Sequence, residues 1–144
     1  LGVQCVRPFS SAFTVANLPN ERQAHRLERW TRIAHSAAKQ SGSSAPSIDP
    51  PQPLAELLSA LPSETEKLLC YERETDLTLK IFAQAHPQLT SLCAIVGPEG
   101  GFSEAEVADA RLSGVHVVGL GTSTLRAETA SIVAITLCQF LWRK

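Results

Sequence analysis

The sequence of 144 residues lacks methionine, closely spaced cysteines and any long hydrophobic run. The cysteines at positions 5, 70, 93 and 138 include no close pair, so we expect neither a metal knuckle nor a redox dithiol, but reduced, buried thiols. The longest apolar stretch, Ser131 to Trp142, is too short to cross a bilayer. No basic-then-apolar signal segment opens the chain. These absences predict a cytoplasmic protein without membrane association.

The sequence also lacks a strong excess of charge. Its formal net charge is −1 and 44% of its residues are hydrophobic, as expected of one soluble globular domain with a sizeable core. Near neutrality gives no general support for nucleic-acid binding. The histidines at positions 25, 35, 86 and 116 do not cluster at metal-ligand spacing, so we predict no metal.

The most informative stretch present is Ile95–Glu104, where a short apolar run stops at a glycine-rich turn. Three glycines and a proline within five residues allow a sharp turn and a close approach of the backbone to a ligand. Ser103 with Glu106 three residues later is a capping-box pattern that predicts the start of a helix. Alone, the pattern fits either a binding loop or an ordinary strand-to-helix turn.

A second unusual stretch, Gly119–Ala130, also joins a strand to a helix. The β-branched run Val115–Val118 precedes it, and a mostly apolar helix is predicted from Glu128 onward. In open α/β sheets, ligands bind at the carboxyl ends of the strands. Two such loops in tandem therefore favour a cofactor site over a pair of plain turns.

Strands alternate with helices along the chain, which predicts an α/β fold with a largely parallel sheet flanked by helices. Strands are expected at 4–9, 67–71, 92–96 and 115–118, helices at 21–40, 53–61 and from 128, and the segment 77–82 is ambiguous. In the first helix, apolar residues recur at helical spacing. They are Ala24, Leu27, Trp30, Ile33, Ala34, Ala37 and Ala38.

The opposite side of that first helix carries a basic stripe. It consists of Arg22, His25, Arg26, Arg29 and Arg32. A charged face kept in water explains the stripe, and so does contact with phosphates of a nucleic acid. Arg22, Arg26 and Arg29 are the candidates for RNA contact. Trp30, on the apolar face, is expected to be a core residue and not a base-stacking platform.

Four ordered motifs resemble the RsmE family, the ribosomal small-subunit RNA (uracil-3)-methyltransferases of the SPOUT superfamily. The strongest are Val96–Ser103 and Leu120–Gly121 with Leu125–Ala130, and the weaker ones are Ala37–Gly42 and Leu68–Glu72. The resemblance covers essentially the whole chain. It implies a SPOUT-type methyltransferase domain over residues 1–144, with a C-terminal trefoil knot and a cofactor-binding knotted half at about 68–144.

The resemblance further implies S-adenosylmethionine as cofactor and a uridine of small-subunit (16S) ribosomal RNA or the 30S subunit as substrate. The implied cofactor-binding residues lie in three loops. They are Leu69, Glu72, Gly97, Pro98, Glu99, Gly100, Gly101, Leu120, Gly121, Leu125, Arg126, Thr129 and Ala130. Because Leu1–Val3 resembles residues that follow the first strand and helix of the family's domain, we expect those elements and an upstream PUA-like RNA-binding domain to be absent from this sequence.

Methylation of uridine at ring nitrogen 3 requires loss of that nitrogen's proton and an unpaired base. Arg126 and Glu128 are the candidate catalytic residues. The alternative is a structural ion pair or cap, since Glu128 falls in the first turn of the predicted helix, where its charge is favoured. We expect a role of the pair in shaping the site more than direct proton transfer by Glu128.

Three positions depart from the family pattern by lacking an expected arginine. Ser43 occupies the position of one such arginine. Ala12–Phe13 replaces a glutamate-arginine pair of the family, and Ser123–Thr124 replaces an arginine-isoleucine pair. Serine and apolar residues cannot replace the charge-assisted phosphate contacts of arginine. The alternative function is therefore a catalytically weakened family member that acts as an RNA-binding or dimerisation module. Apolar residues around much of the last helix predict a homodimer.

Overall fold

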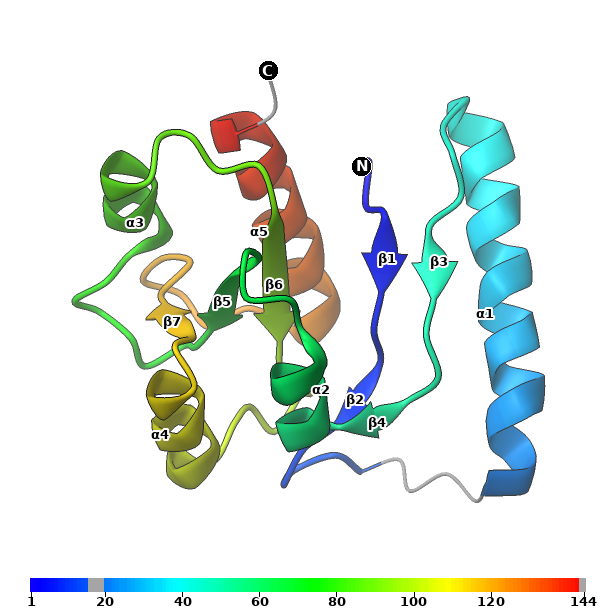
Figure 1. Cartoon of the computed structure of the whole chain (residues 1–144), viewed down its shortest axis with the longest axis horizontal. Coiled ribbons are helices and arrows are strands. Elements are labelled where there is room, and N and C mark those ends of the chain that lie inside the picture. The colour runs from blue at the N-terminus through cyan, green and yellow to red at the C-terminus, as the bar shows by residue number, and fades with distance from the viewer. Residues whose placement is uncertain (16–19, 143–144) are drawn as a thin grey trace.

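The computed structural model describes residues 1–15 and 20–142 and shows alternating strands and helices (Figure 1). The elements, in chain order, are β1 (Cys5–Val6), β2 (Phe9–Ser10), α1 (Asn20–Ser41), β3 (Ser47–Ile48), β4 (Gln52–Pro53), α2 (Leu54–Ala60), β5 (Glu66–Cys70), α3 (Leu79–Ala85), β6 (Leu92–Val96), α4 (Glu104–Leu112), β7 (His116–Val118) and α5 (Ala127–Trp142).

The central sheet has three strands in the order β6-β5-β7, and both pairings are parallel. Leu69 in the middle strand lies opposite Ile95 of β6 and Val117 of β7. Two further parallel pairs, β1 with β3 and β2 with β4, form next to it. The predicted α/β class with a parallel sheet flanked by helices is confirmed, although the sheet is divided into one three-stranded and two two-stranded parts.

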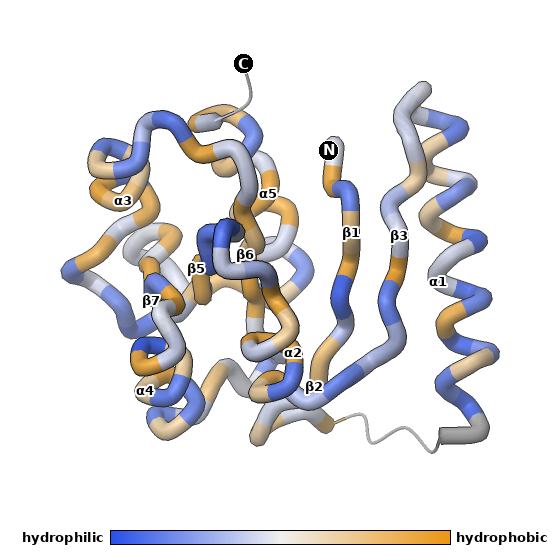
Figure 2. The backbone as a smooth tube through the Cα atoms, viewed as in Figure 1, coloured by the Kyte–Doolittle hydropathy of each residue, from blue (hydrophilic) through white to orange (hydrophobic). Residues whose placement is uncertain are grey.

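The two faces of the central sheet bury separate apolar clusters, because side chains alternate along a strand. On one face, Leu69, Ile95 and Val117 pack with residues of α2 and α4, among them Leu57 and Ala110. On the other face, Leu68 and Val118 pack with Leu79 and Phe82 of α3 and with Leu137 of α5. Apolar segments accordingly follow the strands and line both sides of them (Figure 2). The core therefore fixes the ends of β5, β6 and β7 relative to one another.

Local sequence signals account for several helix boundaries. The predicted capping box of α4 is confirmed: the Ser103 hydroxyl accepts from the Glu106 N–H and the Glu106 carboxylate accepts from the Ser103 N–H. The ambiguous segment 77–82 is resolved as the start of α3, with Thr78 as N-cap accepting from the Ile81 N–H. The strand predicted at 92–96 has the same bounds in the structure, the other predicted strands and helices agree to within one residue at each end, and 4–9 contains two short strands.

Helix α1 lies at the edge of the molecule beside β3 (Figure 1). Its apolar face is only partly used, because Ala38 is buried and Leu27, Trp30 and Ala34 are half-buried. Three other residues of the predicted apolar face are exposed, namely Ala24, Ala37 and Ile33, whose side chain is 55% exposed. The thiols expected to be buried are free but only partly buried.

Candidate functional site

A cavity of about 500 Å³ opens where β5, β6 and β7 end. Three chain segments form it: the end of β5 with the residues after it, the glycine-rich loop after β6, and the loop between β7 and α5. The lining residues are Cys70, Tyr71, Glu72, Val96, Gly97, Pro98, Glu99, Gly100, Gly101, Phe102, Leu120, Gly121, Ser123, Thr124, Leu125, Arg126, Ala127, Glu128 and Ala130. Its position at the carboxyl edge of a parallel sheet is typical of ligand sites in α/β proteins.

The glycine-rich loop needs its glycines for close packing. A side chain at Gly97 would meet the ring of Phe102 at 2.9 Å. Gly101 has a φ of 71°, a conformation that other residues rarely adopt, and its N–H donates to the Pro98 carbonyl at 2.8 Å. The loop is thus a tight turn held against Phe102, a buried side chain of the first apolar cluster.

The segment after β5 is tied to α4 and to β7. The Glu74 carboxylate accepts hydrogen bonds from the Asp76 and Leu77 N–H groups at 2.8 and 3.1 Å and pairs with Arg111 of α4 at 2.6 Å. The Leu77 N–H and the Arg111 guanidinium hold the pKa of the Glu74 carboxyl below its usual range. This turn is therefore ordered by an ionised side chain.

Gly119, at the end of β7, fits tightly beneath the same turn. Its N–H donates to the Leu77 carbonyl at 2.9 Å and its carbonyl accepts from the Leu79 N–H at 3.0 Å. A Cβ at Gly119 would lie 2.2 Å from the Glu74 carbonyl oxygen. Close packing and two backbone hydrogen bonds consequently hold together the two lining segments that contain Glu72 and Leu120.

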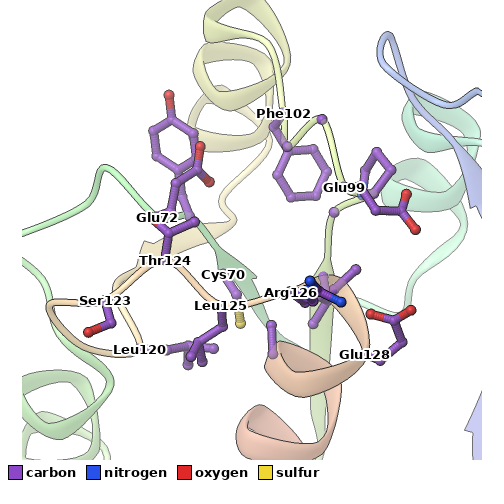
Figure 3. Close-up of a pocket in the computed structure, with 18 of the residues that line it drawn as sticks. Cys70, Glu72, Glu99, Phe102, Leu120, Ser123, Thr124, Leu125, Arg126 and Glu128 are labelled. Atoms are coloured by element: carbon purple, nitrogen blue, oxygen red, sulfur yellow. The ribbon is translucent and has the colours of Figure 1, made fainter.

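Apolar side chains and carboxylates share the cavity wall (Figure 3). Leu120, Leu125 and Cys70 gather at one side, whereas Glu72, Glu99 and Glu128 surround the opening. Burial raises the pKa of the Cys70 thiol to about 12, and nearby Cys138 adds to the shift, so Cys70 stays neutral. The described lining residues include three carboxylates and one cationic side chain, that of Arg126. The cavity wall therefore suits a partly apolar ligand that bears positive charge.

Arg126 and Glu128 stand at the start of α5. Glu128 lies in the first helical turn, where the helix dipole favours a carboxylate, and both residues line the cavity. In the described part of the chain, no ion pair within 4 Å joins them, so the alternative of a structural ion pair is not seen. Both side chains are exposed at the opening and are accessible to a ligand.

The structure brings together most of the residues expected to bind a cofactor. Leu69 and Thr129 are the exceptions: Leu69 is fully buried in the core next to the cavity, and Thr129 is exposed on α5 outside the lining. Arg22, Arg26 and Arg29 lie on α1, away from the cavity wall.

Sequence reasoning missed several lining residues, namely Cys70, Tyr71, Val96, Phe102, Ser123, Thr124 and Ala127. For Cys70 the alternation of strand side chains offered a signal, since it points to the face opposite Leu69. The others are set by loop conformation, which short-range patterns do not specify.

The described residues contain neither a metal-binding cluster nor a membrane-spanning helix. Within 1–15 and 20–142, no group of three or more His, Cys, Asp or Glu side chains could hold a metal ion. No helix among the same residues is long and apolar enough to cross a membrane.

Comparison with known proteins gives relatives over nearly the full chain. Ribosomal RNA small subunit methyltransferase E of Bacillus subtilis is 30% identical over 97% of this chain and 57% of its own length. The protein of the same name from Mesomycoplasma hyopneumoniae is 33% identical over 96% of this chain and 59% of its own length. The chain thus spans a little over half the length of these curated relatives.

Solved structures agree with this likeness. Ribosomal RNA small subunit methyltransferase E of Neisseria gonorrhoeae, bound to S-adenosyl methionine, superposes with a TM-score of 0.87 at 34% identity, covering 98% of this chain and 56% of that one. A putative methyltransferase of Legionella pneumophila, in complex with the same cofactor, gives 0.85 at 27% identity, covering 96% and 56%. The family model described as "RNA methyltransferase domain" matches residues 1–139, and the chain therefore belongs to this family of RNA methyltransferase domains.

Proposed function

We propose that this chain is the cofactor-binding domain of an S-adenosylmethionine-dependent methyltransferase that modifies ring nitrogen 3 of a uridine in 16S ribosomal RNA. The observation that carries the proposal is the three-segment cavity at the carboxyl edge of the sheet, in a fold shared with two proteins crystallised with that cofactor. The proposed substrate is the small-subunit RNA or the 30S subunit, which would place the protein in the cytoplasm.

The cavity fits the cofactor in size and chemistry. A volume of about 500 Å³ falls within the usual range for small-molecule sites. Leu120 and Leu125 provide apolar surface for a purine ring, and the tight turn at Gly97–Gly101 leaves backbone groups accessible. The carboxylates at the opening favour the positive charge of a sulfonium. The proposed cofactor contacts are the expected binding residues that line the cavity. Leu69, which is buried in the core, and Thr129, which lies outside the lining, are expected to support these residues without touching the cofactor.

The bound cofactor supplies an electrophilic methyl group, and the protein supplies position and charge. Positioning accounts for much of the rate in such a transfer. Glu128 is proposed to orient the uridine base or to receive the proton of its ring nitrogen, and Arg126 to stabilise negative charge on the deprotonated base. We propose that both residues act at this opening.

The RNA is proposed to contact α1. This helix begins at the lower edge in Figure 1, the edge toward which β1, β3 and β6 run, so its N-terminal half lies on the side of the molecule to which the carboxyl ends of these strands point. Arg22 and Arg29 are exposed there, and the Arg26 guanidinium lies 5.9 Å from the Trp30 ring centroid. Ser123 and Thr124 line the cavity where the family pattern has an arginine, so α1 would supply more of the phosphate contact.

Residues 1–144 are proposed to form one SPOUT-type domain whose knotted half covers about 68–144. The tight seating of Gly119 beneath the 74–78 turn supports an entwined chain. A homodimer is proposed through α5, because Ile132 and Phe140 on that helix are 58% and 82% exposed.

The test is transfer of a radiolabelled methyl group from S-adenosylmethionine to small-subunit ribosomal RNA, offered naked and as 30S subunits. Modification of one uridine at ring nitrogen 3, weakened by Glu128→Gln and by Arg126→Gln, supports the proposal. Cofactor binding without transfer to either substrate supports the second candidate, a catalytically weakened RNA-binding or dimerisation module. The absence of three family arginines favours that candidate.

A further inference from the structure

Phe13 is an aromatic side chain on a short, hydrogen-bonded turn that lies against Gly100 of the cavity wall. It follows β2 within residues 11–14, where the Ser11 N–H donates to the Thr14 hydroxyl at 2.8 Å and the Thr14 N–H to the Ser11 carbonyl at 3.1 Å. The Phe13 side chain is nevertheless 49% exposed. The ring is therefore presented to solvent from a fixed backbone.

The turn is fastened to the glycine-rich loop and its helix. The Ala12 N–H donates to the Glu106 carboxylate at 2.8 Å, across 94 positions of sequence. Glu106 is also the capping-box residue of α4, and its second oxygen accepts from the Ser103 N–H and hydroxyl, both at 2.9 Å. Although burial raises the pKa of the Glu106 carboxyl, the bonds from Ser103 and Ala12 bring it below its usual range, so the anchor is ionised.

Phe13 lies directly against Gly100, a residue of the cavity wall. A Cβ at Gly100 would lie 2.7 Å from the Phe13 Cβ, so glycine is what lets the two segments touch. The base of the Phe13 side chain thus rests on the loop that lines the cavity. About half of the side chain stays exposed next to this loop.

The other aromatic residues near the cavity are buried in the core. Tyr71 and Phe102 line it but are 9% and 5% exposed, and Phe102 packs beneath Gly97 and stacks on Phe9 with ring centroids 6.1 Å apart. Phe82 and Trp142 belong to the cluster on the other side of the sheet. Among the described residues, Phe13 is consequently the ring at the glycine-rich loop that has a free face.

We propose that Phe13 is a substrate-positioning residue, which stacks on an unpaired base of single-stranded RNA at the mouth of the cavity. The inference rests on the proposed function and adds to it a contact to the base. A base that reacts at its pairing edge must leave the helical stack, and an aromatic face replaces the stacking it loses. A ring can do this for any base, so Phe13 adds affinity for an unstacked base but no sequence selectivity.

The variants Phe13→Ala, Phe13→Leu and Phe13→Trp separate stacking from packing, with Leu112→Ala as the control. Leucine keeps an apolar contact with Gly100 but has no aromatic face, and tryptophan keeps the face. Leu112 is 87% exposed at the end of α4 and lies outside the cavity wall. For each variant of the full chain, the measurements are the melting temperature, the Kd for S-adenosylmethionine, the Kd for labelled single-stranded oligouridine, and KM and kcat on small-subunit RNA.

The expected result for Phe13→Ala and Phe13→Leu is a loss of oligouridine affinity, and a rise in KM, by about tenfold. Phe13→Trp and Leu112→Ala should bind as the unmodified chain does, and cofactor affinity should be unchanged throughout. Unchanged RNA affinity in Phe13→Leu would overturn the inference and leave Phe13 as apolar cover for the loop. Binding of the cofactor but not of oligouridine by the unmodified chain would also overturn it, whereas failure to bind the cofactor would count against the proposed function itself.

Discussion

Replacing Gly119 by alanine is the sharpest available test of how the cavity is assembled. The added Cβ would lie 2.2 Å from the Glu74 carbonyl oxygen, which is backbone and not the end of a flexible side chain. Restoring an ordinary contact requires a displacement of about 1 Å or more. That displacement strains the two hydrogen bonds through which Gly119 joins Leu77 and Leu79, of 2.9 and 3.0 Å.

The cost can be worked out from these parts. Overpacking in a well-packed region costs roughly 1–3 kcal/mol, and each weakened backbone bond up to about 1 kcal/mol. A total of about 1–5 kcal/mol corresponds to a fall in melting temperature of roughly 3–20 °C for a chain of this size. The displacement pushes apart the segment of Glu72 and the segment of Leu120, which both line the cavity, so binding of S-adenosylmethionine should be lost as well.

The matched control is Gly114→Ala. Gly114 has a φ of 74°, but a side chain there meets nothing within 4 Å. Only the backbone strain remains, at about 1 kcal/mol, and cofactor binding should be kept. Differential scanning fluorimetry with and without the cofactor measures both effects. If Gly119→Ala melts no lower than Gly114→Ala, or if it binds the cofactor normally, then the packing of Gly119 against Glu74 does not hold the cavity together.

Three further outcomes follow from the same contacts. Because the folded-state pKa of Glu74 is depressed, its contribution to stability is present above the unfolded value of about 4.3 and is lost as the pH falls below it; urea titrations from pH 7 to 3 should show a smaller loss for Glu74→Gln. Cys70, with a pKa raised to about 12, should resist iodoacetamide at pH 8 in the folded chain, and rapid alkylation detected by mass spectrometry would argue against its burial. Leu69→Ala, at a side chain that is fully buried, should cost about 2–5 kcal/mol in urea unfolding, and a loss no larger than that of the exposed Leu112→Ala would contradict the assigned core.

Short-range patterns predicted the elements that build the site. The strand Leu92–Val96 and the capping box of Ser103 and Glu106 depend on neighbours within a few residues, and the structure has both. Two special loops at strand ends favoured a cofactor site over plain turns, and the family resemblance pointed to Gly97 and Leu120, both of which line the cavity.

Contacts between segments that are distant in the sequence could not be predicted from it. The bond from Ala12 to Glu106 and the seating of Gly119 against Glu74 depend on how the whole chain folds back, and no periodicity encodes them. The exposure of Ile33 could not be predicted for a related reason. A helical pattern identifies the apolar face of α1 but not how much of that face its neighbours cover.

The central claim is that the cavity binds S-adenosylmethionine, and isothermal titration calorimetry of the chain with that cofactor tests it most directly. The account predicts saturable binding at one site per chain, a raised melting temperature, loss of binding in Leu125→Asp and normal binding in Leu112→Ala. A folded chain that gives no binding heat, or a Leu125→Asp variant that binds as tightly as the unmodified protein, would contradict it.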